Sequence, residues 1–255
     1  MIKFHLHGWK KDKRDSRDLL FKTMPAIPID RLPPAVDFSG KMSAVEQQGG
    51  VLSCTANAAV GALEYLKHDS LQRRFLCFRL FRDLSRLFVY YNTRSLSMCE
   101  NEDSGASIRD TIKALAKWGA CYEKTWPYNE SAWAKKPAEK CYSEAEKFKA
   151  KVYYRAETRL EVLNAVAQKL PVAFGAVLYE SFETSGLGGK ISVPMPEERV
   201  VGGHAMLVVG YDISKEHFIV RNSWGPTWGD RGYCYLPFSY CTFGERVDDF
   251  WVIKE

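Results

Sequence analysis

Hydrophobic residues recur every three or four positions in the first half of the chain, a spacing typical of helices with one buried face. Such a pattern begins at Cys54 and continues to about His68. Ser107 and Gly119 fit an N-cap and a C-terminal stop around a similar pattern. The same spacing predicts four further helices, over residues 81–94, 107–119, 143–150 and 158–170.

After Lys151 the pattern changes to short runs that are apolar throughout or alternate with polar residues, separated by glycines. These runs predict six strands, over residues 151–156, 171–180, 204–212, 217–224, 232–237 and 248–254. We find no internal repeat. The chain is therefore predicted to be an α+β protein, with a helical lobe over about 38–149 and a β-rich lobe over about 150–255. A site is expected in the cleft between the two lobes.

Residues 1–31 differ from the rest and predict an N-terminal extension to one large domain over 32–255. The stretch "KKDKRDSRD" alternates in charge, which is typical of a solvated segment. It is followed by "MPAIPIDRLPP", in which four prolines favour extended backbone over helix.

Composition narrows the function classes. Apolar residues make up 46% of the 255 residues and charged residues 26%, as in an ordinary globular domain. A net charge of +5 is too mild to indicate nucleic-acid binding. No apolar run has the ~18 residues of a membrane span, and no secretory signal is recognisable. We expect a monomer and favour a cytoplasmic location, although a trimmed leader or leaderless export stays open.

Seven cysteines without a C-x-x-C pair argue against a zinc site, and we expect neither metal nor cofactor. Six of them are expected to be packed thiols, and a Cys234–Cys241 bridge is left open. Cys54 has two interpretations. A free cysteine is most often a buried structural residue. At the start of a helix, however, the helix dipole favours the thiolate, which is the nucleophilic form.

Three residues elsewhere favour the nucleophile. His204, in "VGGHAMLVVGYD", could take the proton of the Cys54 thiol. Asn222, in "NSWGPTWGDRGY", could fix the tautomer and orientation of that imidazole without adding charge. The side-chain amide of Gln48 and the backbone N–H of Cys54 could stabilise an oxyanion. Trp224 could shield the His–Asn hydrogen bond from water.

The blocks "VEQQGGVLSC", "GGHAMLVVGYD" and "RNSWGPTWGDRGY" resemble the signature blocks of the papain-like cysteine peptidases, in the same order. The resemblance covers roughly residues 32–255. It implies a two-lobed fold, with a helical left lobe, an antiparallel β-barrel-like right lobe and the active site in the interlobe cleft. It also implies a thiol-dependent endopeptidase that acts on peptide or protein substrates through a cysteinyl acyl-enzyme.

The resemblance extends to the N-terminus and to substrate binding. The extension resembles the short leader of a xylellain-like bacterial branch, so Gly8 to Phe21 are expected to cover the cleft in a latent zymogen. Three residues are implied to bind substrate: Gly105, through its backbone, Gly203, as a roomy and uncharged pocket wall, and Trp224. Asp248 and Asp249 near the floor of that pocket would favour basic side chains.

Two departures from the family pattern keep alternatives open. Val51 stands where a disulfide cysteine is usual, and Thr55 replaces the usual aromatic residue after the nucleophile. A catalytically impaired pseudo-peptidase that binds peptides is therefore one alternative. A Cys–His–Asn acyltransferase or amidase on another fold is a second, disfavoured because it predicts neither Gln48 nor the N-S-W-G block.

Overall fold

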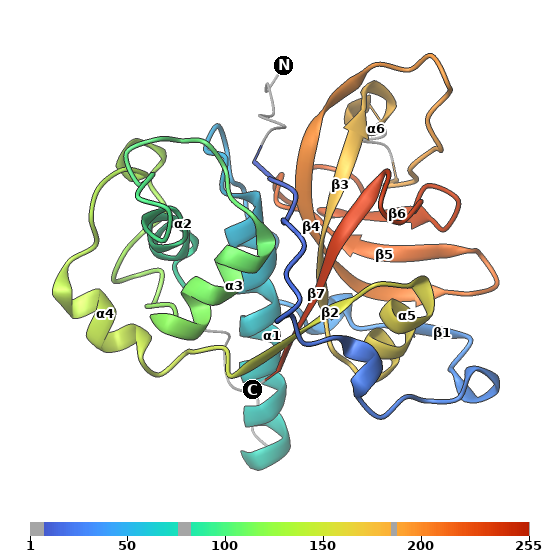
Figure 1. The fold of residues 1–255 in the computed structure, drawn as a ribbon, viewed down its shortest axis with the longest axis horizontal. Helices are drawn as coiled ribbons and strands as arrows, with labels where there is room; N and C mark the ends of the chain where they lie inside the picture. Colours follow the sequence, from blue (N-terminus) through green and yellow to red (C-terminus); the bar gives the residue numbers. More distant parts are fainter. Residues whose placement is uncertain (1–7, 76–82, 185–187, 255) are drawn as a thin grey trace.

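The computed structural model describes residues 8–75, 83–184 and 188–254. A helical part lies beside an antiparallel sheet, and the long helix α1 (Cys54–Phe75) runs along their junction (Figure 1). One continuous hydrophobic core spans both parts. The predicted α+β class and two-part architecture are confirmed.

Helix α1 is buried on all sides over its first half, from Cys54 to Leu66, because it packs against both the other helices and strands β3 and β4. A helix that is apolar all round needs such a central position. It extends beyond the predicted end at His68 to Phe75, since the polar stretch after His68 contains no Gly or Pro to stop it.

The other helices of this part are α2 (Arg86–Ser95), α3 (Ile108–Lys117) and α4 (Glu139–Ala145). Helix α2 begins later than predicted. The predicted start at residue 81 lies outside the described residues, but residues 83–85 are not helical and the Ser85 side chain caps Phe88 N. Ser107 caps α3 as predicted. The prediction over 143–150 is displaced, since α4 follows Pro137 and buries Cys141 and Ala145.

The sheet contains seven strands: β1 (Ala35–Asp37), β2 (Val152–Ala156), β3 (Val172–Tyr179), β4 (Val200–Asp212), β5 (His217–Arg221), β6 (Tyr233–Pro237) and β7 (Val247–Lys254). Their order is β2-β7-β3-β4-β5-β6, and the short β1, which the sequence did not predict, pairs with β4. All pairs are antiparallel. The sheet is not closed, so the predicted barrel-like lobe is an open sheet with β2 and β6 at its edges.

Two helices accompany the sheet, α5 (Arg159–Ala167), which Thr158 caps, and α6 (Glu180–Thr184). The last residue of the predicted strand 171–180 is therefore the first residue of α6. The predicted strand 217–224 ends at Arg221, which leaves Asn222 and Ser223 on the connection to β6. Short 3-10 turns lie at Phe21–Thr23, Ile29–Arg31, Ser39–Lys41 and Glu130–Ala132.

A buried polar junction joins the two parts below the cleft. Ser43 Oγ donates to Glu64 Oε2 on α1 at 2.6 Å and accepts from Arg221 Nη1 of β5 at 3.0 Å. Burial raises the pKa of Glu64 to about 7, and the Arg221 charge acts against that rise. Because both charged groups are buried and share one hydroxyl, relative motion of the two parts would break a desolvated network.

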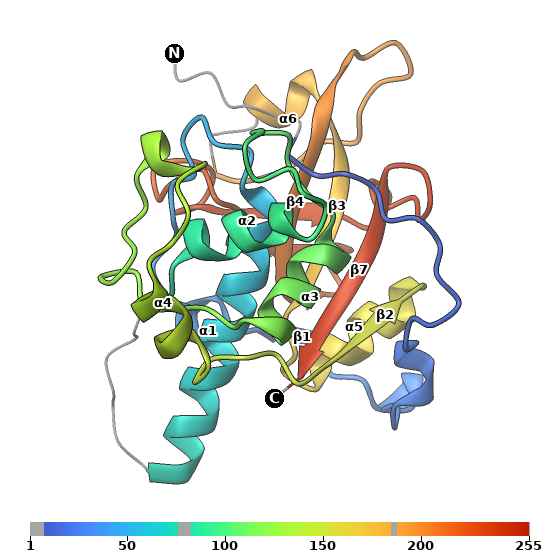
Figure 2. The ribbon, with the colours of Figure 1, turned by 60° about the vertical axis from the view of Figure 1, so that its left-hand side comes forward.

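The N-terminal chain runs between the helical part and the sheet (Figures 1 and 2). From Gly8 onwards it passes the start of α1, follows the junction and reaches β2, where Arg155 N donates to Leu19 O at 2.7 Å. Phe21 then buries its ring in the core. The division into residues 1–31 and 32–255 stays a prediction.

Candidate active site

Cys54 is the first residue of α1, and the loop before it is fixed from both sides. Gln48 N donates to Ser223 O at 2.9 Å, and Leu52 N donates to the Asp103 carboxylate at 3.2 Å. Gly49 has a φ of +59° in this loop, a conformation that favours glycine. The polar, glycine-bearing stretch therefore holds the nucleophile candidate at the end of a rigid helix.

The Cys54 thiol is fully buried. Burial raises its pKa to about 12, against the effect of backbone N–H groups of Ala205, Thr55 and Cys54 itself that face the sulfur. The nearness of Ala205 places the sulfur beside the residue that follows His204 in β4. In this closed arrangement the thiol is neutral, and the N–H groups at the helix start are already aimed at it.

His204 and Asn222 form a directed pair. His204 Nε2 lies 2.7 Å from Asn222 Oδ1, and the same oxygen accepts from Ser223 N at 2.8 Å. Because a backbone N–H requires an acceptor, the Ser223 contact identifies the oxygen end of the Asn222 amide. The neutral His204 ring must then carry its proton on Nε2, which leaves Nδ1 as the base.

Within the described residues, His204 Nδ1 is buried without a hydrogen-bond partner. Burial lowers the pKa of His204 to about 4, and the hydrogen bond to Asn222 raises it in part. A neutral imidazole with an unoccupied acceptor, next to the residue whose N–H faces a thiol, can accept the thiol proton once a substrate is present.

Trp224 lies against the same imidazole. The ring centroids of Trp224 and His204 are 4.9 Å apart, and Phe182 and Trp228 meet Trp224 edge to face. Trp224 is itself buried. Its position supports the predicted shielding of the His204–Asn222 hydrogen bond, whereas contact with substrate stays a prediction.

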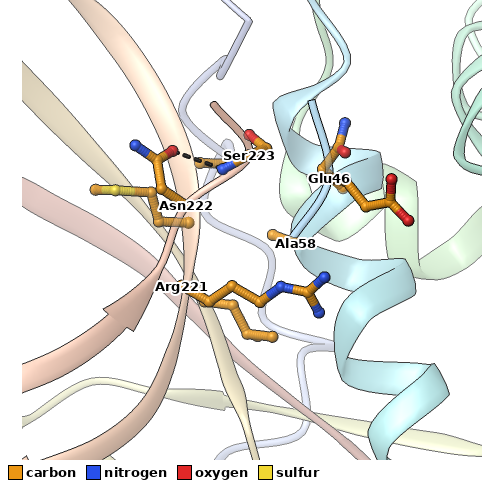
Figure 3. Close-up of a pocket in the computed structure, with 9 residues that line it drawn as sticks. Glu46, Ala58, Arg221, Asn222 and Ser223 are labelled. Atoms are coloured by element: carbon orange, nitrogen blue, oxygen red, sulfur yellow. Dashed lines mark hydrogen bonds between the residues drawn. The ribbon is translucent and has the colours of Figure 1, made fainter. Parts of the chain in front are cut away.

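Gln48 connects the loop before Cys54 with the loop that carries Asn222. Its Oε1 accepts from Ser223 Oγ at 2.6 Å, and its Nε2 donates to Val51 O at 2.9 Å. Because the Val51 carbonyl can only accept, that contact fixes the amide orientation, and the second Nε2 hydrogen is available for an oxyanion. Behind these loops lies a cavity of about 10 Å³, room for roughly one water molecule, lined by Asn222, Ser223, Glu46, Ala58 and Arg221 among others (Figure 3).

Gly8 lies directly over the Cys54 sulfur. A Cβ atom built on Gly8 would be 2.7 Å from Cys54 Sγ and 2.8 Å from Leu52 O, closer than real contacts allow. The Gly8 carbonyl accepts from Ala106 N at 2.9 Å. That oxygen is thus bound by Ala106 rather than by Gln48, so Gly8 covers the nucleophile without lying as a substrate carbonyl would.

Trp9 and Lys10 continue this coverage as an added strand. Lys10 N donates to Ala106 O at 2.9 Å, which gives Trp9 and Ala106 a parallel bridge, and Trp9 N donates to Gly203 O at 3.4 Å. Gly105, predicted to pair with an extended peptide, has a φ of +72°, and a Cβ there would lie 2.4 Å from Gly8 O. Ala106 therefore makes the backbone hydrogen bonds to the N-terminal segment, and Gly105 leaves the space that the Gly8 carbonyl occupies.

Buried charges hold the segment further along. Asp12 Oδ2 accepts from Trp251 Nε1 at 2.7 Å, and Asp12 N donates to Asp249 Oδ2 at 2.7 Å. Arg155 Nη2 lies 2.9 Å from Asp249 Oδ1, and Arg109 Nη2 lies 2.5 Å from Asp18 Oδ2. These residues, which we call the anchor, are Asp12, Asp18, Arg109, Arg155, Asp249 and Trp251.

The sequence model of the papain family of cysteine proteases matches residues 32–241. The chain belongs to this family. Its structure is similar to that of xylellain, a cysteine protease from Xylella fastidiosa, with a TM-score of 0.88 and 36% identity over 97% of this chain and 95% of that one. It is also 33% identical to an uncharacterised peptidase C1-like protein of Acanthamoeba polyphaga mimivirus, over 97% of this chain and 86% of the relative.

More distant relatives include cathepsin K of Gallus gallus, 29% identical over 81% of this chain and 59% of that protein. The fold also matches a procathepsin L 3 of Tenebrio molitor, with a TM-score of 0.69 and 22% identity over 94% of this chain and 75% of that one. This papain-family chain is thus a cysteine-type peptidase, a hydrolase of peptide bonds.

The two departures from the family pattern are accommodated by packing. Thr55 Oγ1 and Thr111 Oγ1 of α3 are 2.9 Å apart, so a buried hydrogen bond between two hydroxyls occupies the place behind the candidate nucleophile. Val51 is buried. Six cysteines, including Cys234 and Cys241, are free thiols, five of them buried and Cys99 partly exposed, whereas Cys77 lies outside the described residues.

Sequence reasoning missed the anchor of this papain-family protease. The alternating charges of residues 10–18 predicted a solvated segment, which is wrong for Asp12, because this carboxylate is 7% exposed. Alternation cannot identify which charge meets a distant partner such as Trp251. Asp248 and Asp249, predicted to attract basic substrates, instead contact Arg155, Lys11 and the segment's Trp9.

Within the described residues, no cluster of His, Cys, Asp and Glu is arranged to hold a metal ion. None of the described helices is both long and apolar enough to span a membrane. The monomeric state, the absence of nucleic-acid binding and the cytoplasmic location stay predictions.

Proposed function

We propose that this chain is a latent thiol endopeptidase in which Cys54 attacks the substrate carbonyl and His204 serves as base and then as acid. Asn222 holds the His204 tautomer, and Gln48 with the Cys54 backbone N–H stabilises the oxyanion. The resulting thioester is hydrolysed by water. The single observation that carries the proposal is the oriented His204–Asn222 pair beside a buried thiol at a helix start.

Latency follows from the position of the segment. Gly8 covers the sulfur, and burial both raises the thiol pKa and lowers that of His204, so neither partner is charged. A thiol that stays protonated is a poor nucleophile. Departure of the segment would rehydrate both groups and bring the two pKa values closer, which allows the thiolate–imidazolium pair to form.

The test uses Gly8→Ala in the full chain, since the added methyl group collides with the sulfur and should displace the segment. Gly40→Ala is the matched control, because a Cβ at Gly40 meets nothing within 4 Å. An epoxide-type cysteine-peptidase inhibitor and a dipeptide-dye substrate report on the site. We expect Gly8→Ala to raise both labelling of Cys54 and turnover about tenfold, and Gly40→Ala to change neither.

Three outcomes separate the alternatives. Labelling at Cys54 without turnover would favour the peptide-binding pseudo-peptidase. Equal labelling of Gly8→Ala, Gly40→Ala and a chain that lacks residues 1–30 would contradict latency. It would leave the nucleophile assignment untouched. Absence of labelling in every form would contradict the nucleophile assignment.

A further inference from the structure

The indole of Trp9 occupies a flat slot in the sheet beside the Cys54 sulfur. A Cβ at Gly175 of β3 would lie 1.9 Å from Trp9 Cε2, and one at Gly203 of β4 would lie 3.1 Å from Trp9 Cε3. Neither glycine has a positive φ, so the backbone would accept any residue at both positions. The absence of side chains at both positions therefore leaves room for a large ring.

Asp249 closes the end of this slot. Trp9 Nε1 donates to Asp249 Oδ2 at 3.1 Å, and the same oxygen accepts from Asp12 N at 2.7 Å. The other oxygen is taken by Arg155 Nη2 at 2.9 Å. Asp249 is fully buried. When the segment leaves, Oδ2 loses both donors while Oδ1 stays paired with Arg155, which partly offsets the charge.

A buried acceptor without a donor is costly, whereas a ring that carries an N–H at the correct edge satisfies it. Tryptophan provides both the flat surface for Gly175 and Gly203 and the donor for Asp249. Phenylalanine provides only the ring. Arginine would bring a second cation next to Arg155.

The slot formed by Gly175, Gly203 and Asp249 lies at the pocket whose wall the family resemblance assigns to Gly203, and we propose that it selects peptides with tryptophan next to the residue that acylates Cys54. Trp9 occupies the slot as a built-in surrogate, one residue from Gly8 at the sulfur. This inference rests on the proposed peptidase function. It replaces the predicted preference for basic side chains at this place.

The experiment compares X-Gly-dye substrates on the full chain, where glycine takes the place of Gly8 and X is its amino-terminal neighbour. Because Trp9 follows Gly8 in the chain, the experiment takes a substrate to cross the site in the direction opposite to that of the segment. X is tryptophan, 2-naphthylalanine, phenylalanine, alanine or arginine. Only a small fraction of molecules is open at any time, but this fraction multiplies kcat/KM equally for all substrates and cancels in their ratios. Gly8→Ala raises the signal if needed.

We expect kcat/KM for tryptophan to exceed that for naphthylalanine, which has the same shape without the N–H, at least tenfold. Asp249→Asn should reduce this ratio to near one, because an amide can turn its NH2 group toward the indole. Both substrates are measured on the same variant, so a change in the fraction of open molecules cancels in the ratio. Gly175→Ala should reduce the tryptophan-to-alanine ratio at least tenfold, since the new methyl group occupies the slot.

A tryptophan-to-naphthylalanine ratio near one in the unmodified chain would overturn the role of Asp249, and a preference for arginine or alanine would overturn the pocket. Both results leave the peptidase function intact. Absence of turnover with every substrate, together with absence of epoxide labelling, would instead remove the proposed function and this inference with it.

Discussion

The predicted catalytic residues and the anchor both lie along the path of the N-terminal segment. The interactions within the two regions differ in kind. Neutral hydrogen bonds orient the side chains of His204, Asn222 and Gln48, and every partner of these side chains belongs to residues 46–54 or 204–224. The anchor instead depends on buried carboxylates and guanidinium groups that join residues 12–18 to α3, β2 and β7.

Under the proposed latency, this difference would allow the segment to leave without disturbing the site. Neutral hydrogen bonds are insensitive to pH near neutrality, whereas buried carboxylates respond to protonation and to the loss of one partner. The four predictions below address the two regions separately, and they run from the largest expected effect to the smallest.

Replacement of the nucleophile should abolish activity without affecting the anchor. Cys54→Ala is expected to lower turnover at least ~10⁴-fold, because no other group can form the thioester. Its melting temperature should change little, since Gly8 and the anchor remain in place. The matched control is Cys241→Ala, another buried thiol, which should retain full turnover in the same dye assay. Turnover that survives in Cys54→Ala would contradict the assignment.

Loss of one anchor carboxylate should open the site without damaging it. Asp12→Ala leaves the buried Trp251 Nε1 donor without its acceptor, and we expect epoxide labelling of Cys54 to rise about 10- to 100-fold. Asp15→Ala is the control, because Asp15 pairs with the exposed Arg17 on the surface and should change nothing. Equal labelling of the two variants would show that the anchor does not hold the segment.

The anchor should also respond to pH. Burial and the nearby Asp249 charge raise the pKa of Asp12 from 3.8 to about 6, although Trp251 and Arg109 act against that rise. Asp12 therefore holds its proton more tightly when the segment is bound than when the segment is free. Binding is strongest below pH ~4 and weakens as the pH rises through 6.

Asp12→Asn keeps the neutral form at every pH and serves as the reference. The ratio of wild-type to Asp12→Asn labelling should be near one at pH 4 and at least ~10 at pH 7.5. Titration of His204 affects both chains equally and cancels in the ratio. A ratio that does not vary with pH would exclude Asp12 as the titrating group, whatever the pH profile of either chain alone.

The smallest effect is expected behind the nucleophile. Thr55→Val keeps the shape but removes the hydroxyl that hydrogen-bonds to Thr111, whose own hydroxyl still donates to Ser107 O at 2.8 Å. We expect a loss of about 1 kcal/mol or less in unfolding free energy by denaturant titration, and turnover within twofold of wild type. A large loss of turnover would give Thr55 a part in positioning Cys54.

The sequence predicted the elements that carry short-range signals. Helix α3 begins after Ser107 because a serine cap and an apolar period coincide there, and the site residues stand in blocks that resemble a known family. Helix α4 was displaced because Cys141 and Ala145 form its buried pair, although neither is strongly hydrophobic in isolation. The open sheet also escaped prediction, since periodicity does not show which strand edges pair.

For the candidate site, the sequence proposed residues that the structure brings together, but it did not show in atomic detail what covers them. Asp12 of the segment pairs with Trp251 and Asp249, and Ala106 and Arg155 contact the segment's backbone. These pairings span large sequence separations, and no local pattern encodes them. Gly175 gave no signal either, because a glycine within a strand indicates a close approach without naming the group that approaches.

The shared hydroxyl of Ser43, between Glu64 and Arg221, has a consequence for how the enzyme is switched on. This network joins the helical part to the sheet, so separating the two parts would break buried hydrogen bonds. In the proposed latent form, access to the sulfur is then controlled by detachment of a single peptide strand. Activation should accordingly be an all-or-none event for each molecule, governed by how often that strand detaches rather than by a gradual widening of the enzyme.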